Sequence, residues 1–255
     1  MNHRSVNIGK RPIGDDHPVY IVFEAGPTHD GIETAKKLVD IAISAGADAI
    51  KFQILDAEKI VAGPQVQFSY TCLVDRNSGE TEEVSESLLE ILKRREMTFK
   101  EWDELIIYCE KREIEFFSTA TNEDELIFLA EHDVNTIKIC SGDVNYHHFL
   151  KQAAKYNWTL QLDTGLSSIG EIEVAVDLLD VCGCKDIIIN HCPSGYPARL
   201  EGINLRVIPT LREIFPYPIA FSDHSPGMEM DIAAVALGAN MIEKTITLDR
   251  TIRSP

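Results

Sequence analysis

Long apolar runs are absent from this sequence. No stretch reaches about 18 consecutive apolar residues, the length at which a membrane-spanning helix becomes a candidate. The opening segment MNHRSVNIGKRPIG also lacks the apolar block of a secretory signal. We therefore expect a chain with neither a membrane span nor a signal peptide.

Basic residues are scarce as well. The 24 Lys and Arg residues stand against 41 Asp and Glu residues, which gives a formal net charge of −17. A surface this acidic repels nucleic acid and anionic membranes, so we expect neither as a partner. An anionic ligand would have to be held by a few locally placed cations.

Cysteines with the spacing of a zinc site are also missing. The six cysteines are scattered, and most lie inside apolar runs. Only one residue separates Cys182 from Cys184, which is too close for the usual zinc spacing, and we expect them in a loop at a helix end. Reduced thiols in a cytoplasmic protein are favoured over disulfides.

A repeating pattern is present in the 255 residues, a length typical of one or two domains. Hydrophobic residues make up 44% of the chain, which is enough for a sizeable core. Short β-branched runs alternate with amphipathic stretches, and several runs are apolar nearly end to end, as in strands covered on both faces. The eight expected strands are residues 19–24, 48–53, 115–119, 136–141, 159–164, 186–192, 218–223 and 241–248.

Helical spacing fills the intervals between these runs. Ile32, Ala35 and Val39 mark one apolar stripe. Gly46 and Gly183 stand where left-handed helix ends are expected. Three capping boxes are expected at helix starts: Asp30-x-x-Glu33, Thr98-x-x-Glu101 and Ser168-x-x-Glu171.

Eight strands, each followed by a helix except the last, predict a (β/α)8 TIM barrel spanning residues 1–255. A doubly wound open sheet is the alternative, but no glycine-rich dinucleotide fingerprint follows any strand. Residues 55–97 form a long insertion after the second strand, in which residues 68–74 and 80–84 are expected to pair as a hairpin. Residues 6–13 are expected to form a second hairpin at the barrel bottom. No eighth helix fits before Pro255, so the sequence resembles a piece of a longer protein.

Polar side chains collect at the carboxyl ends of the expected strands, where the active sites of such barrels lie. They are Glu24, Lys51 with Gln53, Ser118 with Thr119, Lys138 with Ser141, Asp163 with Thr164, His191 with Ser194, Ser222 with His224, and Glu243 with Lys244 and Thr245.

Lys51 and Lys138 are the most informative of these residues. Each lies in an apolar strand, where a buried ammonium needs a compensating anion or loses its charge. Three roles are therefore open for each lysine. It forms a structural ion pair with a neighbouring carboxylate, it binds a phosphate or carboxylate group of a ligand, or it is a Schiff-base lysine of lowered pKa. Glu24 either pairs with Lys51 or shuttles a proton. His224 is a hydrogen-bonded structural residue, a metal ligand or a proton carrier.

Six strand-end segments, taken in order, resemble the barrel of the sialic acid synthase family. That family includes the synthases of neuraminic, legionaminic and pseudaminic acids and of spore-coat sugars. The resemblance runs from about Val19 to Pro255. The segments are Phe-Glu-Ala-Gly-Pro-Thr-His-Asp-Gly, Ala-Gly-Ala-Asp-Ala-Ile-Lys-Phe-Gln, Ile-Lys-Ile-Cys-Ser-Gly-Asp, His-Cys-Pro-Ser-Gly-Tyr-Pro, Phe-Ser-Asp-His-Ser and Ile-Glu-Lys-Thr-Ile-Thr-Leu-Asp.

The resemblance implies a transferase that forms a carbon–carbon bond. It would condense phosphoenolpyruvate with an N-acylated amino sugar, of the N-acetylmannosamine kind, to give a nonulosonic (sialic-type) acid and phosphate. A divalent cation, Mn²⁺ or Mg²⁺, polarises the open-chain aldehyde in the family. The alkene carbon of phosphoenolpyruvate attacks that aldehyde, water adds at the enol-ether carbon, and phosphate leaves with cleavage of its C–O bond.

Matching the segments residue by residue carries roles onto this chain. Lys51 and Lys138 would hold the anionic substrate, and Glu24 would act near the reacting carbons. His224 would bind the metal. The residues left for substrate contacts are Thr119, Ser141 and Ser222 as hydroxyl donors, Ser194 as a polar contact, and Glu243 on the sugar side.

Three positions depart from the family pattern. Thr245 replaces the usual second metal-binding histidine, and a hydroxyl is a poor substitute for imidazole. Asp163 replaces a serine that could touch phosphate, and its carboxylate would repel phosphate unless it serves as a metal ligand. Thr28 precedes His29 where the family has asparagine before histidine.

The family also carries a small C-terminal antifreeze-like domain that caps the partner's active site in a domain-swapped homodimer. That domain lies outside these 255 residues. Two readings compete with the synthase. One is a Schiff-base aldolase or lyase that uses Lys51 or Lys138, and the other is a degenerate barrel retained for binding or assembly.

Overall fold

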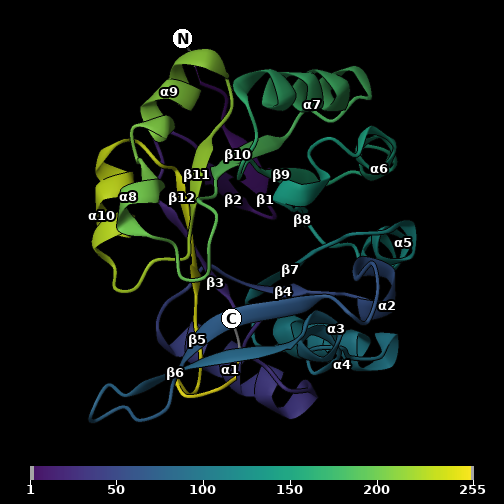
Figure 1. The fold of residues 1–255 in the computed structure, drawn as a ribbon. Helices are drawn as coiled ribbons and strands as arrows, with labels where there is room; N and C mark the ends of the chain where they lie inside the picture. The colour runs from purple at the N-terminus through teal and green to yellow at the C-terminus, as the bar shows by residue number, and fades with distance from the viewer. Residues whose placement is uncertain (1–2, 254–255) are drawn as a thin grey trace. The chain divides into compact units, whose positions relative to one another are not determined.

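Eight strands form a closed barrel in the computed structural model, which describes residues 3–253 (Figure 1). Each strand falls within one of the runs expected from the sequence, so the TIM-barrel prediction is confirmed. The order around the barrel is β10-β11-β12-β3-β4-β7-β8-β9. The strands are β3 (Tyr20–Glu24), β4 (Ala49–Gln53), β7 (Glu115–Thr119), β8 (Thr136–Ile139), β9 (Thr159–Asp163), β10 (Ile187–His191), β11 (Ile219–Asp223) and β12 (Met241–Thr245).

The chain divides into two compact units. Unit 1 contains the residues up to Val22 together with Phe117–Lys244, and unit 2 contains Phe23–Phe116 and the residues from Thr245 onward. Every residue of β8, β9, β10 and β11 is buried, so the polar side chains of these strands are enclosed together with their apolar neighbours.

Helices alternate with the strands of unit 1. An antiparallel hairpin of β1 (Val6–Ile8) and β2 (Arg11–Ile13) precedes them, as expected, and the Thr159 hydroxyl at the start of β9 donates to the carbonyl of Asn7. The helices are α5 (Glu123–Glu131), the 3-10 turn η1 (Ser141–Asp143), α6 (His147–Ala153), α7 (Ile169–Val181), α8 (Leu200–Ile203), α9 (Val207–Ile214) and α10 (Glu229–Ala236).

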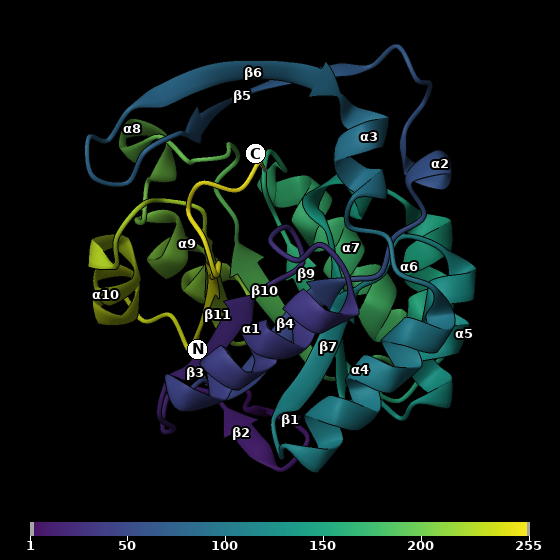
Figure 2. The ribbon, with the colours of Figure 1, turned by 90° about the horizontal axis from the view of Figure 1, so that it is seen from below.

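Unit 2 holds the long insertion. Its hairpin is confirmed: β5 (Gln67–Leu73) pairs antiparallel with β6 (Thr81–Ser87). Helices α1 (Ile32–Ser44) and α4 (Phe99–Lys111) lie side by side, and α2 (Ala57–Ile60) and α3 (Leu88–Lys93) contact each other at one end of the hairpin (Figure 2). The hairpin and α3 share a small apolar cluster of Phe68, Tyr70, Cys72, Val84 and Ile91.

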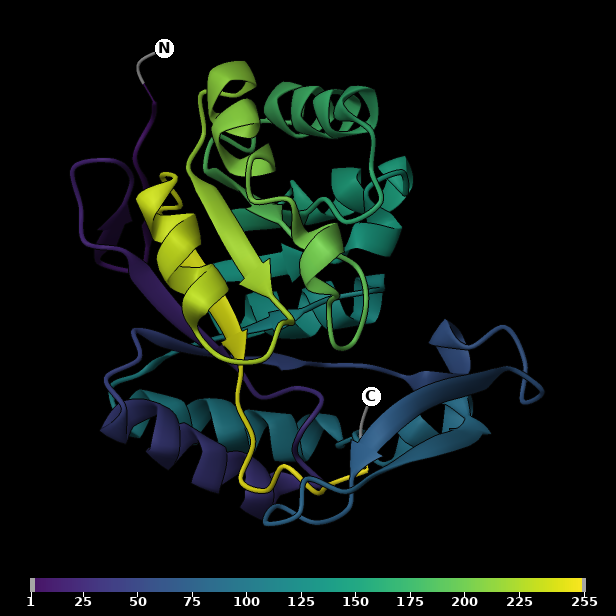
Figure 3. The ribbon, with the colours of Figure 1, turned by 60° about the vertical axis from the view of Figure 1, so that its left-hand side comes forward.

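The segment after β12 runs beside this hairpin. Figure 3 shows it in yellow next to the blue strands, where Arg253 lies 3.1 Å from Glu82 and Arg76 lies 3.0 Å from Asp249. Residues 246–253 contain no helix. Within residues 3–253, none of the helices combines the length and the apolar character that crossing a bilayer requires.

Helix starts test the capping predictions. The Thr98–Glu101 and Ser168–Glu171 boxes are confirmed at α4 and α7. The box expected at Asp30 is wrong, because its carboxylate accepts from the Thr34 hydroxyl, and Gly31 is the residue before α1. An unexpected box, Asn122 with Glu125, begins α5.

Both expected glycine helix ends are confirmed. Gly46 has φ +79° and Gly183 has φ +98°. Cys182 follows the last residue of α7, so the Cys182–Cys184 segment is the predicted helix-end loop.

Truncation of a buried side chain on α4 should destabilise the fold. Leu105 is completely buried, so we expect Leu105→Ala to lower the free energy of unfolding by about 2–5 kcal/mol. Ile107 on the same helix is 38% exposed, and Ile107→Ala should cost less than half as much. Urea denaturation followed by circular dichroism measures both variants. Equal losses would contradict the packing described for α4.

Candidate active site

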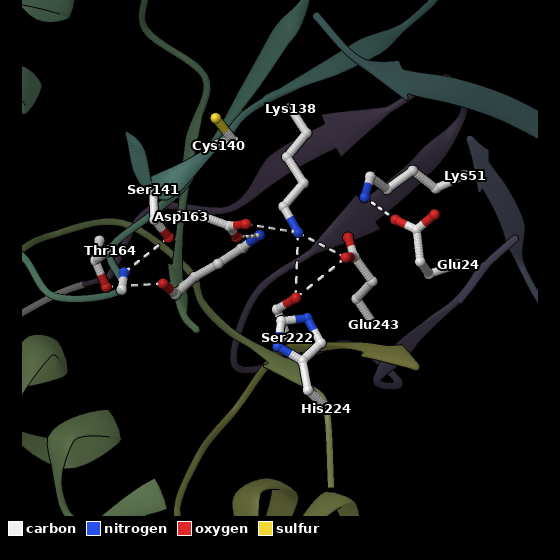
Figure 4. Close-up of polar contacts among 12 residues, drawn as sticks. Glu24, Lys51, Lys138, Cys140, Ser141, Asp163, Thr164, Ser222, His224 and Glu243 are labelled. Carbon is white, nitrogen blue, oxygen red and sulfur yellow. Dashed lines mark hydrogen bonds and ion pairs between the residues drawn. The ribbon is translucent and has the colours of Figure 1, made fainter. Parts of the chain in front are cut away.

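A buried ammonium lies at the centre of a polar cluster in unit 1. Lys138, on β8, is only 2% exposed. Its Nζ lies 2.9 Å from Asp163 Oδ2 and 2.6 Å from Glu243 Oε1, and it donates to Ser222 Oγ at 3.1 Å (Figure 4). The cluster therefore joins side chains from four strands.

Strand register brings these side chains together in pairs. Ser222 on β11 lies opposite Glu243 on β12, and its hydroxyl donates to Glu243 Oε1 at 3.1 Å. Asn190 on β10 lies opposite Asp163 on β9, and its Nδ2 donates to Asp163 Oδ1 at 3.0 Å. Lys138 lies opposite Gln161, so Asp163 is its diagonal neighbour two residues further along β9.

The two carboxylates keep Lys138 charged. Burial by itself would lower the pKa of this ammonium, but Asp163 and Glu243 together raise the pKa well above its ordinary value. The cluster formally combines one positive charge with two negative charges. An anion arriving at Lys138 therefore meets an ammonium that is already neutralised by protein groups.

Hydroxyl groups follow the ends of the neighbouring strands. Thr119, the last residue of β7, is buried and lies opposite Lys138 of β8. The Ser141 hydroxyl accepts from the backbone N–H of Gly165 at 2.9 Å. A Cβ at residue 165 would lie 2.6 Å from the carbonyl oxygen of Cys192, so this close approach requires glycine. Ser194, in contrast, is exposed, and its side chain does not enter the hydrogen bonds that hold the Lys138 cluster.

His224 follows β11 in the same unit. Its Nδ1 lies 3.3 Å from the carbonyl oxygen of Pro193, and its ring lies 4.6 Å from the Tyr196 ring, measured between centroids. Burial, with a smaller contribution from Lys138, lowers the pKa of His224 below its ordinary value. The imidazole is therefore neutral at pH 7. His191, which is also buried, has its Nε2 at 2.6 Å from the carbonyl oxygen of Ile203 and is a structural residue.

The side chains present do not fit the divalent cation that the family resemblance implies. Among residues 3–253, no group of three or more His, Cys, Asp and Glu side chains is arranged to hold a metal ion. Asp163 is held by Lys138 and Asn190, so its carboxylate is engaged by protein donors rather than presented as a ligand. Thr245 is exposed.

Unit 2 contains a second buried ion pair. Lys51 on β4 is 2% exposed, and its Nζ contacts Glu24 Oε2 at the end of β3. Glu24 Oε1 accepts from the backbone N–H of Gly26 at 2.6 Å. A Cβ at residue 26 would lie 2.6 Å from that same oxygen, so a larger residue here would displace the Glu24 carboxylate. The pairing of Glu24 with Lys51 was one of the two alternatives that the sequence left open.

Neither the contact of Asp163 with Lys138 nor the contact of Asn190 with Asp163 was anticipated. We expected Asp163 to repel phosphate or to bind metal, and Asn190 was not considered. One signal was available: Gln161 and Asp163 alternate with the leucines of β9, which places both polar side chains on one face. Asn190 is likewise the one amide in the run Ile-Ile-Ile-Asn-His.

Comparison with known proteins points to one family. A model of the NeuB family matches residues 38–255. An uncharacterised protein of Methanocaldococcus jannaschii is 37% identical over 98% of this chain and 68% of its own length. The N,N'-diacetyllegionaminic acid synthase of Campylobacter jejuni is 35% identical over 92% of this chain and 69% of its own length. The crystal structure of an N-acetylneuraminic acid (sialic acid) synthetase from Leptospira borgpetersenii, in complex with citrate, superposes with a TM-score of 0.85 at 33% identity, covering 99% of this chain and 81% of that one.

His29 in unit 2 generates a pH-dependent prediction. It is completely buried beside Phe52 and Trp102, and burial, followed by the charge of Arg95, lowers its pKa to about 4. In the unfolded chain the same imidazole takes up a proton below about pH 6.5. Proton uptake therefore favours unfolding, and stability should fall by about 3 kcal/mol as the pH drops from about 6.5 to about 4.

Thermal melting of wild type, His29→Gln and the exposed control His148→Gln across this pH range tests the prediction. His29→Gln should remove much of the loss on acidification, and His148→Gln should retain it. The same acid sensitivity in all three proteins would show that His29 does not carry the effect.

Proposed function

This chain belongs to the NeuB family, and we propose that it is the barrel of a synthase that condenses phosphoenolpyruvate with an N-acylated amino sugar. The products would be a nonulosonic acid and phosphate. Relatives that carry synthase names and align over more than nine-tenths of this chain support the synthase activity. The particular sugar and the use of phosphoenolpyruvate belong to the proposal.

The observation that carries this proposal is the Lys138 cluster. A buried ammonium, a hydroxyl and a carboxylate meet at 2.6–3.1 Å beside the carboxyl ends of buried strands. In a protein with a net charge of −17, such an ammonium is the kind of local cation that an anionic substrate needs. We propose that Lys138 binds the phosphate or carboxylate group of the substrate. The hydroxyls of Ser222, Thr119 and Ser141 would donate hydrogen bonds to the same oxygens.

The remaining residues receive roles from the chemistry of the reaction. The new bond joins the alkene carbon of phosphoenolpyruvate to the aldehyde carbon of the sugar, and water adds to the neighbouring carbon before phosphate leaves. Glu243 would accept a hydrogen bond from a sugar hydroxyl. Glu24, held by Lys51 and Gly26, would position the water and take its proton. Ser194, which is exposed, would make the polar contact to the substrate that the resemblance implies.

The charge state of Lys138 argues against the Schiff-base alternative. An imine forms only from a neutral amine, whereas Asp163 and Glu243 raise the pKa of Lys138. Lys51 is also paired with a carboxylate. The degenerate barrel has more support than the Schiff-base enzyme, because Asp163 already neutralises Lys138 and residues 3–253 offer no group of three metal ligands.

The cellular setting is proposed on similar grounds. All six cysteines are free thiols, and four of them are buried. We therefore place the protein in a reducing compartment, the cytoplasm. We further propose that the complete enzyme is a homodimer in which a small domain from the partner subunit covers the sugar.

Phosphate release by the full-length protein tests the reaction. Release should require both phosphoenolpyruvate and an N-acylated amino sugar. Ser222→Ala keeps both ion pairs of Lys138 and should lower kcat/KM about tenfold or more, and Lys138→Ala about 100-fold or more. The exposed control Lys185→Ala should match wild type.

Lys138→Ala also leaves two buried carboxylates without their cation, at a cost of about 3–5 kcal/mol, so its folded fraction must be checked by thermal melting. Ser222→Ala is the variant that remains informative if Lys138→Ala unfolds. No release with any sugar of a broad panel would reject the synthase in favour of the degenerate barrel.

A histidine introduced at residue 245 tests the metal site. Thr245→His supplies the imidazole that the family pattern has at this position, and should tighten Mn²⁺ binding about tenfold or more. Isothermal titration with MnCl₂ measures the change, with Thr247→His as a control two residues away on the same segment. Equal affinities for both variants would mean that any metal site is built from other residues.

A further inference from the structure

We propose that Asp163 sets the anion selectivity of this site, because its carboxylate occupies the Lys138 ammonium and competes with a phosphorylated substrate for it. The proposal rests on the function proposed above and concerns one residue in which this chain departs from the family pattern. Phosphate binding at Lys138 is then weakened by a built-in competitor.

The competing carboxylate is held from both sides. Asp163 Oδ2 lies 2.9 Å from Lys138 Nζ, and Asp163 Oδ1 accepts from Asn190 Nδ2 at 3.0 Å. The residue is 6% exposed, so little water is available to screen its charge. Because both oxygens are engaged, the carboxylate does not turn away from the ammonium without losing a hydrogen bond as well as the ion pair.

The charges around Lys138 show what the carboxylate does to an anion. Lys138 contributes one positive charge, and Asp163 and Glu243 formally contribute two negative charges. A phosphate placed against the ammonium would add further negative charge within a few ångströms of Asp163. With a serine at residue 163, the ammonium would keep only Glu243, and the cluster would be formally neutral before the anion arrives.

The polar atoms beside Asp163 add to this effect. Asn190 Oδ1 is buried and has no hydrogen-bond partner among the described residues. Asn190 donates one of its two amide N–H groups to Asp163, and both oxygens of that carboxylate are already engaged, so the pair adds a buried oxygen acceptor without a donor to this part of the site. Acceptors repel phosphate oxygens and accept hydroxyl or amino groups. The wild-type protein should therefore bind free phosphate weakly, even though the site contains a buried lysine.

Titration calorimetry on the full-length protein tests this, with inorganic phosphate and phosphoenolpyruvate as separate probes. Asp163→Ser should tighten the binding of both anions about tenfold or more. Asp163→Asn removes the charge but keeps the side-chain volume, and should give most of the same gain. Asp177→Ser, on the exposed face of α7, changes the net charge equally and should leave both affinities at the wild-type values.

Each outcome decides the proposal. Unchanged or undetectable phosphate binding in Asp163→Ser overturns it, and so does a gain in Asp163→Ser that Asp163→Asn lacks, because space rather than charge would then be responsible. Tighter anion binding in both variants supports it. If those variants bind phosphate more tightly but no protein forms product from phosphoenolpyruvate and amino sugars, the selectivity assignment stands and the synthase proposal fails.

Discussion

The ion pairs of Lys138 are the interaction on which the arrangement of the candidate site depends. Removing an ammonium from water is costly, and the chain compensates with two carboxylates at 2.9 and 2.6 Å. These partners come from β9 and β12, so the charge network also links strands that are distant in sequence. The same contacts that make burial of Lys138 tolerable reduce its attraction for any other anion. Stability and ligand binding are therefore opposed at this one nitrogen.

Glycine makes the surrounding geometry possible in two places. Gly165 brings the backbone after β9 against the carbonyl of Cys192, and Gly26 lets the chain after β3 turn close to the Glu24 carboxylate. In each case a Cβ would lie 2.6 Å from an oxygen atom. The strand ends that hold the candidate site therefore also carry a backbone constraint.

Much of the fold was predictable because it depends on local pattern. Apolar runs located all eight strands, and both hairpins were expected. Side-chain partners were harder, because they depend on strand register, which composition does not encode. Asp163 was identified as a departure from the family, yet its bond to Lys138 follows only from the pairing of β8 with β9. The cap predicted at Asp30 was also wrong because of a side-chain partner, since the Thr34 hydroxyl donates to its carboxylate.

The hairpin of β5 and β6 buries its apolar residues against one another and against α3. A segment that is held by contacts of its own can change its length or its tip while those contacts remain. The β5–β6 hairpin can therefore change in evolution without a change in the eight-stranded barrel. Differences in sequence and length among related chains should accumulate in this hairpin sooner than in the barrel strands.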